Sequence, residues 1–180
     1  MKIIAFTGMP FSGKSEAVAM AKTFGIPVVR MGDMVWEEVK RRGLILSDET
    51  VGPVAHEMRL KKGKDIWANR TIEVIESMDR SDCIVIDGIR NIEEIDAFKH
   101  RFGEDFFLVA IVVSDEVRHQ RALARRRADD SDDINDIIDR DNREIQWGIR
   151  EVIQQADRSF LNDGSLDSFC LEMKGFFESL

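Results

Sequence analysis

No part of this sequence limits the possible folds as strongly as a loop near its start that contains two glycines. The loop reads Gly8-Met9-Pro10-Phe11-Ser12-Gly13-Lys14-Ser15, and it lies between the apolar run 3–7 and an alanine-rich stretch. A strand, a loop with the pattern G-x-x-x-x-G-K-[ST] and a helix, in that order, are typical of a phosphate-binding loop. Glycines let the backbone turn its N–H groups toward phosphate oxygens, and the helix start adds partial positive charge. We therefore predict a nucleoside triphosphate site here, with ATP as the nucleotide.

The residues of this loop have predicted parts in binding the nucleotide. Lys14 is expected to reach the β- and γ-phosphates, and the Ser15 hydroxyl is expected to bind Mg²⁺. The predicted cofactor-binding residues are Gly8, Met9, Pro10, Phe11, Ser12, Gly13, Lys14, Ser15, Glu16 and, from a later helix, Arg121.

Length and charge narrow the class of protein. The chain has 180 residues, of which 43% are hydrophobic, and this suits one domain spanning 1–180. Its net charge of −8 argues against DNA binding and against an acidic membrane surface. Cys83 and Cys170 lie far apart, without the spacing of a zinc site or a disulfide framework. We expect a cytoplasmic monomer or homodimer that does not associate with membranes.

Apolar runs alternate with helical stretches along the whole chain. The predicted strands are 3–7, 27–30, 83–87, 106–113 and 159–162. The predicted helices lie near 14–24, 33–43, 49–61, 65–79, 91–101, 115–127, 133–157 and 166–179. Several strands are nearly continuous in Val and Ile, as in strands that are covered on both faces. The alternation predicts an α/β three-layer sandwich, with a parallel five-stranded sheet and helices on both faces.

A carboxylate ends the third predicted strand. The run Cys83-Ile-Val-Ile-Asp87 places Asp87 at the carboxyl edge of the sheet, where the phosphate-binding loop also lies. An acid in that position holds Mg²⁺, usually through water. Ser15 and Asp87 are therefore the predicted metal site.

Three further motifs resemble those of nucleotide kinases. Asp87-Gly88-Ile89-Arg90 is similar to the D-G-x-P-R signature of nucleoside monophosphate kinases, without its proline. Met31-Gly32-Asp33-Met34 resembles the T-G-D-M/L element of their acceptor pocket. Asp115-Glu116-Val117, followed by Arg121, Arg125 and Arg126, looks like the entrance of the adenylate kinase lid, and Arg127 to Asp130 with Arg140 looks like its exit.

Together these motifs resemble a family of archaeal kinase-like proteins that are grouped with dephospho-coenzyme A kinases and related to adenylate kinase. The resemblance covers most of the chain and implies the fold of P-loop nucleotide kinases and the use of ATP. Two positions depart from the pattern. Phe11 replaces a glycine that is commoner in the loop, so its ring should point away from the phosphates. Trp36 stands where adenylate kinases carry an arginine that grips the acceptor phosphate.

Arginines in the predicted lid, about 118–143, suggest how phosphoryl transfer is catalysed. Arg118, Arg121 and Arg125 share one helix face, and Arg140 and Arg143 continue on the next helix, so the two segments could clasp a triphosphate. Phosphoryl transfer needs such positive charges around the γ-phosphate. The predicted catalytic residues are Lys14, Asp33, Arg90, Arg121, Arg125, Arg127 and Arg140.

The acceptor is predicted to bind to a helical insert at about 32–79. The predicted acceptor-binding residues are Gly32, Asp33, Trp36, Arg59, Arg70 and Arg90. A nucleoside monophosphate is the favoured acceptor, and a ribose hydroxyl, with Asp33 as the base that takes its proton, is the alternative. A P-loop ATPase that transfers nothing also stays open, whereas a GTPase is disfavoured because the N-K-x-D motif is missing. The three histidines have neither metal nor triad spacing.

Overall fold

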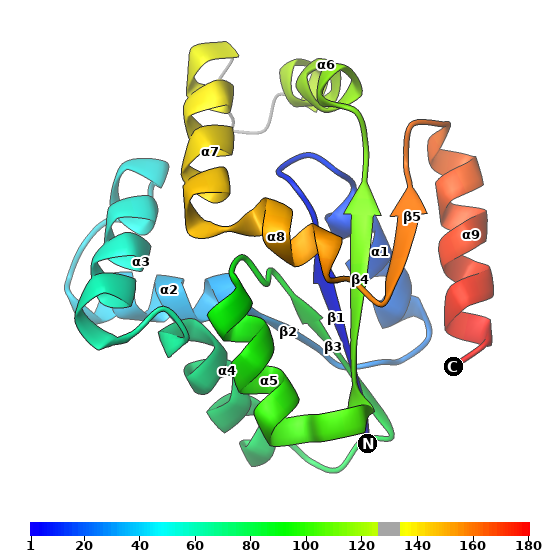
Figure 1. Ribbon diagram of the computed structural model, residues 1–180, viewed down its shortest axis with the longest axis horizontal. Coiled ribbons are helices and arrows are strands. Elements are labelled where there is room, and N and C mark those ends of the chain that lie inside the picture. The colour runs from blue at the N-terminus through cyan, green and yellow to red at the C-terminus, as the bar shows by residue number, and fades with distance from the viewer. Residues whose placement is uncertain (126–133) are drawn as a thin grey trace.

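The computed structural model describes residues 1–125 and 134–180, which form an α/β fold around one parallel sheet (Figure 1). Its strands lie in the order β2-β3-β1-β4-β5. They span Lys2–Thr7 (β1), Val28–Arg30 (β2), Cys83–Asp87 (β3), Phe106–Val112 (β4) and Arg158–Leu161 (β5). The predicted five-stranded parallel sheet is confirmed.

Helices connect the strands and cover both faces of the sheet. They span Lys14–Thr23 (α1), Met31–Arg41 (α2), Asp48–Lys62 (α3), Ile66–Ser77 (α4), Ile92–Phe102 (α5), Asp115–Arg125 (α6), Ile134–Trp147 (α7), Ile149–Gln154 (α8) and Leu166–Glu178 (α9), and a short 3₁₀ turn spans Gly103–Asp105. In the described parts of the chain, no helix is long and apolar enough to cross a membrane.

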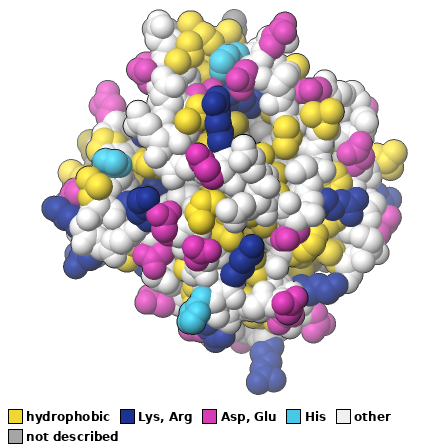
Figure 2. All heavy atoms as spheres, viewed as in Figure 1, with side chains coloured by type: hydrophobic (Ala, Val, Ile, Leu, Met, Phe, Trp, Pro, Cys, Tyr) yellow, Lys and Arg dark blue, Asp and Glu magenta, His cyan; other side chains and the backbone are white. Residues whose placement is uncertain are grey.

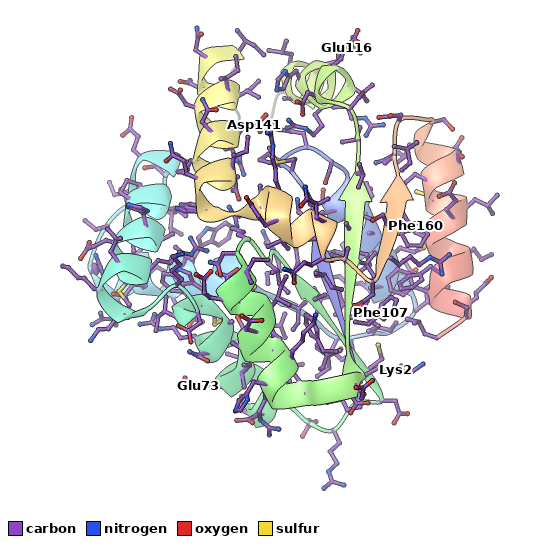
Figure 3. The ribbon with its side chains drawn as sticks, viewed as in Figure 1. Lys2, Glu73, Phe107, Glu116, Asp141 and Phe160 are labelled. Atoms are coloured by element: carbon purple, nitrogen blue, oxygen red, sulfur yellow. The ribbon has the colours of Figure 1, made fainter. Side chains whose placement is uncertain are left out.

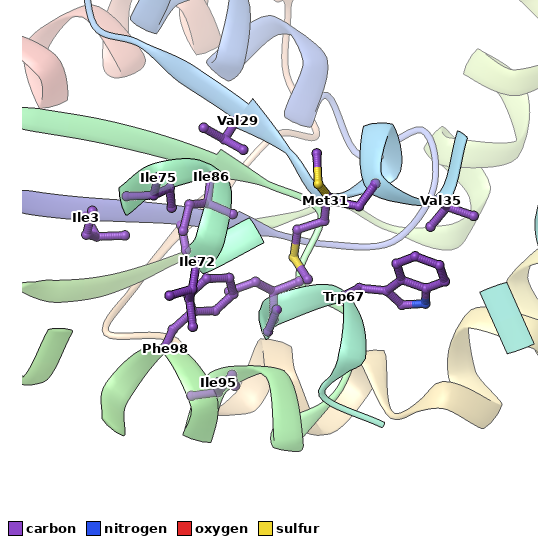
Figure 4. Packing of buried hydrophobic residues seen from close by; sticks show 14 of the residues in the cluster. Ile3, Val29, Met31, Val35, Trp67, Ile72, Ile75, Ile86, Ile95 and Phe98 are labelled. Atoms are coloured by element: carbon purple, nitrogen blue, oxygen red, sulfur yellow. The ribbon is translucent and has the colours of Figure 1, made fainter. Parts of the chain in front are cut away.

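The central strand β1 divides the core in two, because successive side chains of a strand point to opposite faces. Ile3 and Ala5 pack with the helices α2 to α5 and with α8. Ile4 and Phe6 pack on the other face, against α1 and α9. Figure 4 shows the first of these clusters, in which Trp67 lies at the end that approaches α2.

The predicted single helix over 133–157 is wrong. Gly148 takes a left-handed conformation, with φ of 104°, and this separates α7 from α8. Side chains such as Ile149 and Val152 keep the helical spacing of apolar residues across the break, so the sequence pattern does not reveal it. α8 packs onto the sheet, whereas α7 rises beyond its edge beside α6 (Figure 1).

The strand order brings two chemically important loops together. β1 lies between β3 and β4, and Phe6 pairs in register with Asp87. The loop after β1 and the loop after β3 therefore leave the same edge of the sheet as neighbours. Thr7 ties them further, because its hydroxyl donates a hydrogen bond of 2.9 Å to the carbonyl oxygen of Ile89.

Candidate functional site

The loop 8–13 has a backbone shape that requires glycine at both ends. Gly8 and Gly13 have φ of 144° and 97°. A Cβ atom would lie 2.4 Å from the carbonyl oxygen of Ile111 if it were added at Gly8, and 2.3 Å from Asn162 Nδ2 if added at Gly13. Phe11 also has a positive φ, 62°, so a bulky residue holds a conformation that glycine takes more easily. The loop is thus tightly folded, as a phosphate-binding loop requires.

Lys14 is half-buried at the end of this loop. Its ammonium group donates hydrogen bonds to the carbonyl oxygens of Gly8 and, at 3.0 Å, of Met9. Burial lowers the pKa of Lys14 to about 8, and the Asp87 carboxylate opposes part of that change. A triphosphate in the loop would supply the negative charge that this cation lacks.

Asp87 and Ser15 fit a magnesium ion that is bound mainly by phosphate and water. Both residues line one cavity of about 180 Å³ beside the loop. Asp87 Oδ2 lies 3.8 Å from Arg30 Nε, so the carboxylate is held without a close ion pair. Among residues 1–125 and 134–180 no cluster of three or more His, Cys, Asp and Glu side chains could cage a metal by itself. Mg²⁺ keeps several waters and uses few protein ligands at nucleotide sites, which matches this pair.

Two cations and one buried acid complete the wall of this phosphate cavity. Arg90 follows β3, whereas Arg140 and Glu144 come from α7. Arg90 is paired with the Glu144 carboxylate. Burial lowers the pKa of Arg90 to about 10, and the neighbouring Arg59 and Arg140 contribute to that change. Arg140 also lies over the Phe11 ring, 5.6 Å from its centroid.

A second cavity, of about 400 Å³, adjoins the first and lies among α2, α3, α4 and α7. Three tryptophans and several arginines line it, in contrast to the backbone lining of the phosphate cavity. The tryptophans are Trp36, Trp67 and Trp147, and the arginines include Arg59, Arg90, Arg140 and Arg143. Glu144 and Gly32 line both cavities, so the two spaces meet at α7 and the start of α2.

A third cavity, of about 440 Å³, lies on the other side of the loop and includes Glu16, Phe11 and Arg121. Arg121 donates a hydrogen bond of 3.3 Å to the carbonyl oxygen of Gly164. Asn162 donates one of 2.8 Å to the carbonyl oxygen of Ser12, which fixes the loop after β5 to the phosphate-binding loop. Phe11 borders both this cavity and the phosphate cavity.

Several predicted residues are not where the sequence suggested. Asp33 lines neither the phosphate cavity nor the second cavity, and its carboxylate is 43% exposed and 3.8 Å from Arg30 Nη1. Arg70 is directed to the buried Glu38 and to Trp67, outside the second cavity. The structure thus does not bring Asp33 and Arg70 together with the other predicted acceptor-binding residues, because their side chains contact other partners.

Arg118 was expected to hold phosphate but has a different place. Its side chain is 1% exposed, and it pairs with Asp115 and with Asp141, the latter at 2.7 Å. It also donates a hydrogen bond of 3.0 Å to the carbonyl oxygen of Pro10. Figure 3 shows Asp141 on the side of α7 that faces α6. Arg118 therefore joins both helices to the phosphate-binding loop. The Arg125 side chain and Arg127 lie outside the described residues.

Three buried acids near the site were not predicted from the sequence. Glu144 pairs with Arg90, and Glu94 accepts a hydrogen bond of 2.8 Å from the Arg90 backbone N–H while it pairs with Arg59. Asp141 contacts His119 Nε2 at 3.0 Å. The spacing of Glu144 and Arg140, four residues apart on one helix face, was the available signal for the first. Glu94 and Asp141 gave no comparable signal in the sequence.

The chain is similar to known protein families in sequence. The sequence model of a family described as AAA domain matches residues 7–138. A UPF0200 protein of Methanosarcina barkeri is 43% identical over 94% of this chain and 90% of its own length. A UPF0200/UPF0201 protein of Archaeoglobus fulgidus is 47% identical over 94% of this chain, which spans only 53% of that relative.

Solved structures share the fold at low sequence identity. TT1252 from Thermus thermophilus has a TM-score of 0.66 and 19% identity, over 99% of this chain and 97% of its own. Shikimate kinase from Bacteroides thetaiotaomicron has a TM-score of 0.62 and 18% identity, over 99% and 96%. Both are similar to this chain in fold, which is the fold of P-loop kinases.

Proposed function

We propose a phosphotransferase function for this chain, which belongs to the UPF0200 family and contains the AAA domain matched above. The proposed reaction transfers the γ-phosphoryl group of Mg·ATP to a nucleotide acceptor. The observation that carries the proposal is the junction of two cavities. One is lined by a phosphate-binding loop with a half-buried lysine, and the other by tryptophans and arginines. An enzyme that only hydrolysed ATP would not need the second cavity.

The residues of the phosphate cavity have proposed roles in this transfer. Lys14 neutralises the transferring phosphoryl group, and Arg140 approaches it from α7. Ser15 and Asp87 would hold Mg²⁺, which would supply positive charge to neutralise the phosphates. Arg121 is proposed to contact the nucleotide from the third cavity. Closure of α6 and α7 would exclude water, which competes as an acceptor.

The acceptor has two candidate chemistries. A nucleoside monophosphate, which the kinase-like motifs favour, would offer a phosphate oxygen and would need no base. A hydroxyl acceptor is favoured by Glu144, a buried carboxylate at the junction of the cavities. In that case the hydroxyl oxygen forms a bond to the γ-phosphorus, the bond to the bridging oxygen breaks, and ADP leaves. The hydroxyl proton passes to Glu144, which replaces Asp33 as the proposed base.

An acceptor screen tests the proposal. The protein is incubated with Mg·ATP and with nucleoside monophosphates, nucleosides or dephospho-coenzyme A, and both ADP and the phosphorylated product are measured. We expect ADP to form with one acceptor class in equal amount to its product. ADP release that no acceptor stimulates would instead favour an ATPase without transfer.

Lys14→Ala gives the matched test of the site. We expect this change to lower the transfer rate by at least ~10²-fold, because it removes a positioned charge next to developing negative charge. Circular dichroism should show an unchanged fold, because desolvation of the Lys14 charge does not stabilise the folded state. Lys22→Ala, at an exposed lysine of α1, should keep the wild-type rate. Wild-type activity in a folded Lys14→Ala variant would rule out this loop as the donor site.

A further inference from the structure

Arg59 and Arg143, at the far side of the second cavity, are unusual among its cations. Arg59 is 7% exposed, and its Nε and Nη1 atoms are buried without a hydrogen-bond partner. Arg143 Nε is also buried without one. An unsatisfied buried donor on a charged group costs free energy that a bound anion would recover. These donors therefore point to a ligand.

Both guanidinium groups are held against the same indole ring. Arg59 Cζ lies 4.5 Å and Arg143 Cζ 5.9 Å from the centroid of the Trp147 ring. His56 Nδ1 accepts a hydrogen bond of 3.3 Å from Trp147 Nε1 and so fixes the ring. Glu94 neutralises part of the Arg59 charge through Nη2. Arg143 has no ion-pair partner within the described ranges, so the pair carries excess positive charge.

A glycine in α3 leaves room for the Arg143 guanidinium group beside Trp147. Gly52, inside α3, lies under this guanidinium group. A Cβ added at Gly52 would come within 3.2 Å of Arg143 Cζ and Nη1. The glycine has no positive φ that would explain it. A side chain at Gly52 would instead disturb the close approach of Arg143.

We infer that Arg59 and Arg143 form a distal anion site that binds a carboxylate or phosphate group of the acceptor. This inference rests on the proposed phosphotransferase function. Arg59 and Arg143 line only the second cavity, whereas Arg90, Arg140 and Glu144 line both. The anion therefore lies away from the transferred phosphoryl group. The acceptor is a two-ended molecule, anionic at one end, with its reacting group beside Glu144.

Binding of inorganic phosphate to the nucleotide-loaded protein tests this site. The phosphate-binding loop is first saturated with Mg²⁺ and a non-hydrolysable ATP analogue, so that it does not take up the probe. Phosphate is then titrated while the tryptophan emission is recorded, with Trp147→Phe identifying the signal of that ring. We expect saturable binding. A parallel titration with acetate tells whether the site prefers a carboxylate or a phosphate.

Two variants change the site without removing the buried Arg59–Glu94 pair. Arg143→Gln should weaken phosphate binding by roughly 10-fold or more, the usual worth of a hydrogen-bonded charge. Gly52→Ala should weaken it in the same direction by displacing Arg143, and it should leave α3 folded. Arg150→Gln, which removes an equal charge from an exposed position on α8, should leave it unchanged.

The outcomes separate the two proposals. If the ATP analogue does not bind the wild-type protein, the phosphotransferase proposal fails and the distal site falls with it. If the analogue binds but phosphate does not, the distal anion site is wrong and the donor site stands. Equal phosphate affinity in Arg143→Gln and Arg150→Gln would also overturn the distal site, because the ion would then bind elsewhere.

Discussion

At the scale of single residues, the site depends on charges that are partly removed from water before any ligand binds. Within the described residues, the hydrogen-bond partners of Lys14 are backbone carbonyl oxygens, and Arg90 pairs with one acid from α7. Burial without full compensation lowers the pKa of both groups, to about 8 and about 10. The free energy of this burial is recovered when phosphate groups enter the cavity.

This pKa predicts proton uptake on nucleotide binding. The ordinary pKa of a lysine is 10.5, and that of Lys14 is lowered to about 8. Ligand-free protein therefore loses this proton as the pH rises through about 8, while a bound triphosphate restores the higher pKa. Calorimetry of Mg·nucleotide binding in two buffers of different ionisation enthalpy should show proton uptake near pH 8.5 and little at pH 6.5. Lys14→Met should abolish the difference, and uptake that persists in this variant would assign it to another group.

At the scale of elements, apolar runs predicted the sheet well and failed for one helix boundary. The strands were found within two residues because continuous Val and Ile runs are characteristic of buried parallel strands. The break at Gly148 was missed because it changes one backbone dihedral angle and leaves the apolar spacing intact. On α2, the structure brings some of the predicted residues to the second cavity but not Asp33. Gly32 and Trp36, four residues apart, line the second cavity, whereas Asp33 lies one residue further around the helix.

Substitution of two glycines by alanine tests whether the break between α7 and α8 requires the positive φ of Gly148. Gly148→Ala should lower the free energy of unfolding by about 1 kcal/mol, because alanine is strained at a positive φ. Its Cβ would meet only ordinary contacts of 3.7 Å or more, so no clash adds to this cost. Gly175→Ala, in open space within α9, should raise the free energy by about 0.5 to 1 kcal/mol. Urea unfolding of both variants measures the difference, and equal shifts would contradict it.

At the scale of the whole molecule, the sequence indicated the phosphate cavity and part of the second cavity. The predicted acceptor-binding residues that line the second cavity are Gly32, Trp36, Arg59 and Arg90. The loop after β1 and Asp87 follow from local motifs and from the meeting of strand ends. The second cavity also needs α7, which packs against helices that lie much earlier in the chain, and such contacts leave no local pattern in the sequence. The molecular surface adds little direction of its own, because Figure 2 shows acidic and basic side chains interspersed over the face in view.

Glu144 couples the two cavities, and Glu144→Gln tests this coupling. The change removes a negative charge beside the phosphate cavity and releases Arg90, so binding of a Mg·ATP analogue should tighten by roughly tenfold, about 1.4 kcal/mol. If the acceptor is a hydroxyl, turnover should also fall by ~10²–10⁴-fold. Titration calorimetry and the transfer assay measure the two effects, with Glu151→Gln at an exposed position of α8 as the control. Unchanged nucleotide affinity would show that Glu144 does not compete with phosphate for Arg90.

The placement of Arg140, Arg143, Glu144 and Trp147 on one face of α7 also bears on how this family can change. The proposed donor closure, acceptor binding and base all depend on this one helix, and the neighbouring helix α6 is joined to the phosphate-binding loop through Arg118. Under the proposed function, a mutation that shifts this helix to suit a new acceptor would therefore also disturb the binding of ATP. Substitutions on α2 and α3, which border the second cavity, would more readily give a related protein a new acceptor. Such substitutions would leave the position of α7 unchanged.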